Sequence, residues 1–178
     1  DDVNLSFDHV VLPAVTFVAP IGGTYDGTNY TYLLNSTTPN YKVSALAVGQ
    51  TIYVNSPNTI LYVTGDVKVN TDQIRIAPGA SLALYVGGST ASVGGNGIVN
   101  GSGAASNFIY YGLPSNTDLK FTGNASFIGS IYAPDTNFTL GGGGSNTYDF
   151  AGACVTKTST MNGHFRFHYD DALRFLKT

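Results

Sequence analysis

"FIGSIYAPDTNFTLGGGG", residues 127–144, places branched and aromatic side chains at strand-like spacing and then breaks the pattern with a proline and four glycines. Ile128 and Tyr132 would lie on the opposite face of one strand from Ile131. Pro134 would end that strand at a corner, because proline cannot donate a ladder hydrogen bond. Residues 136–140 would form the next side of the same coil, followed by a glycine turn. The stretch therefore predicts one turn of a strand-built coil.

Similar strand centres recur along the chain at a nearly constant interval. They are Tyr62, Tyr85, Tyr110, Tyr132 and, in a fifth repeat, Ala153 or Cys154. The intervals are 23, 25, 22 and 22 residues, and a second short strand follows inside each unit. Such a period is typical of a parallel β-helix, in which stacked coils share one core. Residues 51–169 are therefore predicted to form an all-β, short parallel β-helix of about five coils.

An antiparallel β-sandwich is the competing interpretation, because it also consists of regularly spaced short strands. The near-constant period, with no two-residue hairpins expected between the strands, favours the β-helix. Composition agrees with an all-β fold. The 178 residues include 22 glycines and no glutamate, and only 11% are charged, so few good helix formers are present.

Charge and hydropathy exclude several classes of function. The net charge is −3, and the eight Lys and Arg residues are scattered, so no nucleic-acid partner is expected. The longest apolar stretch, residues 10–21, contains Pro13 and Pro20 and is too short to cross a bilayer. We therefore expect no membrane insertion by this segment and interpret the chain as a mature or excised ectodomain. Cys154 cannot form an internal disulfide and is expected to be buried.

The candidate polar residues near the C-terminus are His164, Arg166 and His168, which would face one way along a strand. Phe165, Phe167 and Tyr169 would face the other way. A metal site would need His164 and His168 together with Asp170 and Asp171. Residues four apart on a strand lie roughly 13 Å apart, and the Arg166 cation lies between the two histidines. We therefore expect a polar edge over a buried aromatic row, with no metal and no cofactor.

Paired carboxylates could serve a glycosidase or a polysaccharide lyase. The candidates away from the termini are Asp66, Asp72, Asp118, Asp135 and Asp149. Several lie beside turn glycines or at strand starts and corners, where aspartate is expected to cap backbone N–H groups. No Arg/Lys pair accompanies any of them, so we expect no catalytic residues.

The C-terminal half resembles an uncharacterised domain of bacterial exported and surface proteins, often linked with pilus-type or cell-envelope proteins. The matching elements are "IYAP" at 131–134, the glycine run at 141–144, Gly152-Ala153, and a closing "FHYD-x-AL" at 167–173. The likeness extends weakly back to Leu61, or about two-thirds of the chain. The resemblance implies a right-handed β-solenoid and carries over no catalytic residue.

Two segments flank the predicted coils. Residues 1–50 lack the repeat and are expected to pack on the solenoid as an irregular or stranded segment. Residues 170–178 are the only good helix candidate, with Asp170 as N-cap. Leu173 and Leu176 would fall on one face of that helix, which predicts a cap that seals the last coil.

The function expected from these features is a non-catalytic structural or adhesive module at a bacterial cell surface or in an exported protein. The alternative is a carbohydrate-binding or polysaccharide-cleaving solenoid that uses exposed Tyr and Asp on one face. Partners would be other envelope proteins or surface glycans. The sequence indicates no particular oligomeric state.

Overall fold

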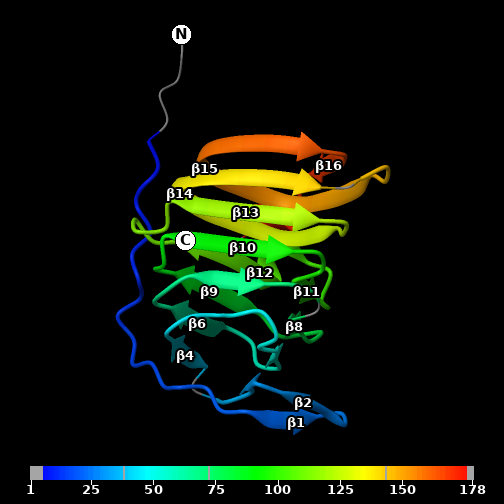
Figure 1. Ribbon diagram of the computed structural model, residues 1–178. Coiled ribbons are helices and arrows are strands. Elements are labelled where there is room, and N and C mark those ends of the chain that lie inside the picture. The colour runs from blue at the N-terminus through cyan, green and yellow to red at the C-terminus, as the bar shows by residue number, and fades with distance from the viewer. Residues whose placement is uncertain (1–5, 38, 72, 143, 176–178) are drawn as a thin grey trace.

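The computed structural model describes residues 6–37, 39–71, 73–142 and 144–175, and it is a parallel β-solenoid of about six turns. Figure 1 shows the strands stacked as successive rungs. The predicted all-β coil is therefore confirmed, with one more turn than expected. No helix among the described residues is long and apolar enough to cross a bilayer.

The rungs form three sides. Within each side, the strands of successive rungs pair in parallel. The first side stacks β4 (Asn40–Val43), β6 (Thr59–Val63), β9 (Leu82–Val86), β12 (Phe108–Gly112), the first halves of β14 (Phe127–Gly142) and β15 (Tyr148–Gly163), and β16 (Phe165–His168). The second side stacks β7 (Val67–Val69), β10 (Thr90–Gly94), β13 (Asp118–Gly123) and the second halves of β14 and β15.

The third side is shorter than the other two. It stacks β3 (Tyr32–Leu34), β5 (Ile52–Val54), β8 (Ile74–Ile76) and β11 (Ile98–Asn100). A 3-10 turn, η1 (Ala105–Asn107), follows β11. In the next turn of the solenoid, residues 124–126 link β13 directly to β14, without a strand on the third side. Because β3 and β4 already form rungs, the solenoid begins within residues 1–50 rather than at residue 51.

The register of the first side corrects two positions of the sequence repeat. Tyr62, Tyr85, Tyr111, Tyr132 and Val155 are mutual partners, so the true intervals are 23, 26, 21 and 23 residues. The sequence spacing puts Tyr110 in this row, but Tyr110 pairs with Leu84 and Ile131 and points into the core. Cys154 likewise pairs with Ile131 rather than with Tyr132. A slip of one residue exchanges the two faces of a strand.

The core is a continuous stack of inward side chains along the solenoid. Leu61, Leu84, Tyr110 and Ile131 are buried at successive rungs of the first side. Four phenylalanines, Phe121, Phe127, Phe138 and Phe150, pack ring against ring in the later turns. Each fully buried side chain of this size stabilises the fold by roughly 1.5–3 kcal/mol. Cys154 is only half-buried, and that burial raises the pKa of its thiol.

The glycine run at residues 141–144 is more than the turn that the sequence predicts. Gly141 and Gly142 are the last residues of β14, and Gly142 pairs with Gly123 below it and Gly163 above it. Gly142 has φ +115°, and a Cβ there would overlap the backbone of Gly123. Stacked glycines therefore let successive strands approach closely at this corner.

One two-residue hairpin does form, contrary to expectation, but it lies outside the repeating coils. β1 (Gly23–Tyr25) and β2 (Thr28–Tyr30) are antiparallel and are joined by Asp26 and Gly27, which both have positive φ. This backbone suits the tight primed turn that Asp-Gly favours. The rings of Tyr25 and Tyr30 pack on Tyr53 of the third side.

Residues 6–21, here called the strap, run past the rungs of the first side and then turn to lie alongside β4 (Figure 1). At one end, Val18 forms a bridge with Tyr41, and the N–H of Val18 donates to the carbonyl of Asn40 over 3.0 Å. At the other end, the Tyr132 hydroxyl donates to the carbonyl of Asp8 over 2.8 Å. The strap therefore links the first rung of this side with the fifth.

The C-terminal segment differs from the helix predicted over residues 170–178. Its described part forms a single 3-10 turn, η2 (Asp171–Phe175). Asp170 Oδ2 accepts from the N–H of Ala105 over 2.9 Å, so this segment lies against η1 at the side of the solenoid. Leu173 is half-buried there rather than over the last coil, and Leu176 falls outside the described residues.

Candidate functional site

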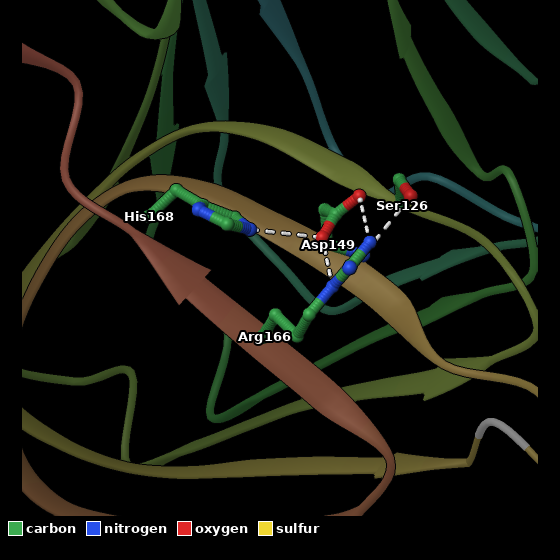
Figure 2. A network of polar contacts seen from close by, with 4 residues as sticks. All are labelled: Ser126, Asp149, Arg166 and His168. Atoms are coloured by element: carbon green, nitrogen blue, oxygen red, sulfur yellow. Dashed lines mark hydrogen bonds and ion pairs between the residues drawn. The ribbon is translucent and has the colours of Figure 1, made fainter.

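The most concentrated group of charged side chains is formed by Asp149, Arg166 and His168 on the last two rungs of the first side. Asp149 and Arg166 are register partners on β15 and β16, and Ala151 is the partner of His168. Outward side chains of neighbouring rungs lie close together at this spacing, about 4.8 Å between strands. The parallel pairing therefore brings these side chains together (Figure 2).

Asp149 accepts contacts from both neighbours in this cluster. Arg166 donates through Nε to Oδ1 over 2.8 Å and through a terminal nitrogen to Oδ2 over 3.1 Å. His168 Nε2 lies 2.9 Å from Oδ1. The backbone N–H of Asp149 also donates to Ser126 Oγ over 3.1 Å, which fixes the main chain that carries the carboxylate (Figure 2).

The electrostatics of the cluster suit a fixed ion pair rather than proton transfer. Hydrogen bonds from Arg166 and then from His168 lower the pKa of Asp149 below its ordinary value. A general acid in glycoside hydrolysis needs the opposite shift, a raised pKa. The side chains are also largely exposed, so water screens the pair strongly.

His164, the third residue of the predicted polar edge, lies apart from this cluster. Its Nδ1 is 2.9 Å from the carbonyl oxygen of Gly144. The aromatic row on the other face of β16 is not buried as the sequence predicts. Phe167 stacks on Phe150 at 4.3 Å between centroids but stays exposed, since no described residue covers the last coil.

No group of three or more His, Cys, Asp or Glu side chains within the described ranges is arranged to hold a metal ion. The acidic residues considered for sugar chemistry also have separate structural contacts. Asp66 Oδ1 accepts from the N–H of Thr90 over 2.9 Å, Asp118 lies 3.4 Å from Lys120, and Asp135 lies 2.7 Å from His9. Asp72 falls outside the described residues. These carboxylates therefore serve as caps and ion-pair partners.

A row of tyrosines on the outer surface of the first side is the second candidate. Tyr62, Tyr85, Tyr111 and Tyr132 occupy one outward position at successive rungs. Tyr85 and Tyr111 stack at 4.6 Å with an interplanar angle of 14°, and Phe17 of the strap packs against Tyr62. Burial raises the pKa of Tyr85 to about 12. Tyr85 is therefore buried, and the other three tyrosines are half-buried.

An apolar groove of about 350 Å³ lies beside the tyrosine row. Small residues Ser130 and Ala153 form part of its lining, and Tyr132, Val155 and Leu173 also line it. Sequence reasoning missed the groove because it depends on the C-terminal segment folding back along the solenoid. The signal in the sequence was the run of small residues at outward positions of "GSIY" and "GAC".

The stacked parallel rungs place this chain in the class of β-solenoid domains. It belongs to the family described as "Domain of unknown function (DUF7305)", whose model matches residues 25–176. Neither the curated proteins nor the solved structures contain a match to the chain.

Proposed function

We propose that this chain is a non-catalytic structural or adhesive module of a bacterial cell-surface or exported protein. The observation that carries the proposal is the strap, which joins the first rung of the solenoid to the fifth. In a solenoid, each coil contacts only its neighbours, so the ends can open separately. A segment that crosses five rungs couples those coils and resists such fraying.

The strap is attached at several separate points. Val18 joins β4, Phe17 packs on Tyr62 at 5.8 Å between ring centroids, and His9 forms an ion pair with Asp135. Val10 of the strap is itself buried. A stiff rod of this kind suits a protein that holds another domain or a binding face away from a cell. The involvement of Asp66, Asp118, Asp135 and Asp149 in caps and ion pairs supports a role without catalysis.

The location can be tested in the organism that encodes the chain. An epitope tag inserted between Ser145 and Asn146, in the turn before β15, should leave the rungs intact, because both residues are exposed. In the full-length protein, antibody should label intact cells. Labelling only after the cells are made permeable would contradict the proposal. A tagged cytoplasmic protein serves as the control for cell integrity.

The carbohydrate alternative has its own test. The purified chain should give no hit on a glycan array and release no reducing ends from polysaccharides, because Tyr85 is buried and Asp66, Asp118, Asp135 and Asp149 are engaged in caps and ion pairs. A reproducible glycan hit that is lost in Tyr132→Ala would replace the structural proposal with a binding function. Release of reducing ends lost in Asp149→Asn would replace it with an enzymatic one.

A further inference from the structure

The last turn of the solenoid is incomplete among the described residues. β16 adds a rung to the first side above β15, but no described strand adds one to the second side above residues 158–163. These six residues are here called the open edge, and all of them are exposed. An edge strand presents a row of unpaired N–H and C=O groups, so it favours the addition of another strand.

The core is also uncovered at the open edge. Two inward residues of β14, Phe138 and Leu140, are buried. Their register partners on β15 are Ser159 and Met161. Met161 therefore occupies an inward position, yet 47% of it is exposed. A segment that completes this rung needs apolar side chains over Ser159 and Met161 and a polar side chain at the outward position between them.

The strap leads toward the open edge. As the residue number falls, its contacts rise from β4 at Val18 to β14 at Asp8 and His9. Figure 1 shows the strap rising along the left of the solenoid to the level of β15. The empty rung lies two strand spacings above β14, or roughly 10 Å. Three residue steps of extended chain, from Asp8 to Leu5, cover about the same distance. Residues 1–5 are therefore long enough to reach the open edge.

The position of the strap also sets the direction of such a segment. Asp135, which holds His9, lies at the corner where the first side of β14 gives way to the second. A chain that enters at this corner and continues toward residue 1 passes first over Thr158 and last over Gly163. It would therefore run antiparallel to β15.

The sequence of residues 1–5, "DDVNL", has the pattern that the empty rung requires. In an antiparallel register that sets Leu5 over Ser159, Val3 falls over Met161. Asn4 then lies between them on the outward face, where a polar side chain is expected. Both apolar side chains of the segment would thus cover the core.

The charges fit the same direction. Residues 157–164 include Lys157 and His164 but no acidic residue. In this register Asp1 and Asp2 lie at the end of the open edge that His164 follows, so opposite charges meet when the histidine is protonated. Such an exposed pair contributes little stability but disfavours the reverse direction.

We propose that residues 1–5 close the last turn of the solenoid as an antiparallel strand on the open edge, with Val3 and Leu5 over the core. Attachment through the strap favours this occupant over a separate chain, because a short tether holds the segment at an effective concentration in the millimolar range. The closed edge would keep the strands of other molecules from pairing there.

Disulfide capture in the full chain tests the register. In a Cys154→Ala background, Val3→Cys with Met161→Cys should form a disulfide within one chain, detected by mass spectrometry of the unreduced, proteolysed protein. Val3→Cys with Val48→Cys is the matched control, since Val48 is as exposed as Met161, at 50%, but lies in the first turn. The control pair should stay reduced. A disulfide that forms only between two chains would overturn the proposal, because a second copy would then occupy the edge.

Hydrogen exchange gives a second measurement. Val3→Asp with Leu5→Asp should speed amide exchange in residues 158–163 several-fold, because the carboxylates cannot lie over the core. Asn4→Asp, at the outward position, should leave that exchange unchanged. Exchange in β7 should be the same in all three proteins, which shows that the solenoid is intact. Equal exchange at the open edge in the parent and the double variant would also overturn the proposal.

Discussion

Gly152 on β15 lies directly above the carbonyl oxygen of Gly129, its register partner on β14. A Cβ at Gly152 would overlap that oxygen, and its φ of +148° is one that side chains rarely adopt. Two rungs of the first side therefore approach so closely here that only glycine fits. The Gly-Ala pair at residues 152–153, noted in the sequence as part of a family pattern, has this steric cause.

Gly152→Ala should destabilise the protein by about 2 kcal/mol or more, because the backbone of two rungs must separate to admit the methyl group. Gly141→Ala is the matched control, since a Cβ there first meets the carbonyl oxygen of Asn162 at 3.6 Å, an ordinary contact. Its effect should stay within about 0.5 kcal/mol. Urea unfolding monitored by circular dichroism measures both. Equal effects in the two variants would contradict the close approach.

Tyr110 provides a second test, because its polar end is buried in the core. Its hydroxyl donates to Asn116 Oδ1 over 2.8 Å, and Asn116 Nδ2 in turn donates to the carbonyl of Gly88. Tyr110→Phe keeps the ring but removes the hydroxyl that donates to Asn116 Oδ1. We expect a loss of about 1–3 kcal/mol in the free energy of unfolding. Tyr111→Phe, on the outer face, should cost less than half as much.

The register of Tyr110 also shows how far the sequence could predict the fold. The period identified the solenoid because each rung must present apolar residues inward at a similar interval. It could not resolve Tyr110 from Tyr111, since both are tyrosines and the coils differ in length by up to five residues. The choice is made by Asn116, which accepts the buried hydroxyl from the following corner. The spacing of residues in the sequence does not predict that hydrogen bond.

The candidate site was less predictable than the fold. Arg166 and His168 stood out in the sequence, but Asp149 was noted only as one of several aspartates. The three meet because β15 and β16 pair with a shift of seventeen residues, shorter than the other shifts on the first side. The sequence indicates that residues 1–50 pack on the solenoid, but it does not indicate which side the strap follows. Its position depends on separate contacts with Tyr41, Tyr62 and Tyr132.

The ion pair between His9 and Asp135 predicts a pH dependence of strap attachment. The hydrogen bond to Asp135 raises the pKa of His9 above 6.5. The pair therefore contributes fully below that ordinary value, and its contribution is lost as pH rises through the raised pKa. In an NMR titration, Asp135→Asn should bring the His9 pKa down toward 6.5. Asp118→Asn, which alters a distant aspartate, should leave it unchanged.

Metal removal should leave the protein unaffected. No cluster of ligands among the described residues can hold an ion, so the folded state gains no free energy from metal. The melting temperature in EDTA should match that in buffer to within about one degree. A fall of several degrees that is restored by one divalent metal would show a site that includes His168 or Asp170.

Removal of residues 170–178 should lower the melting temperature and promote aggregation. The reason differs from the end cap that the sequence predicts, because the described part of this segment lies along the side of the solenoid. Asp170 accepts from the N–H of Ala105, and Leu173 covers one edge of the apolar groove beside Ile109 and Val155. Truncation after Tyr169 would leave that N–H without its carboxylate and would uncover the groove.

Two point variants, Asp170→Asn and Leu173→Ala, separate these two effects, and each should cost about 1 kcal/mol in the free energy of unfolding. Arg174→Ala is the control, since Arg174 is exposed and lies 3.7 Å from Asp171, and its loss should cost under about 0.5 kcal/mol. Thermal melts and light scattering report stability and aggregation for all four proteins. If the truncated chain melts like the parent and stays in the same association state, the segment is a tail and its contacts with Ala105 and the groove do not stabilise the fold.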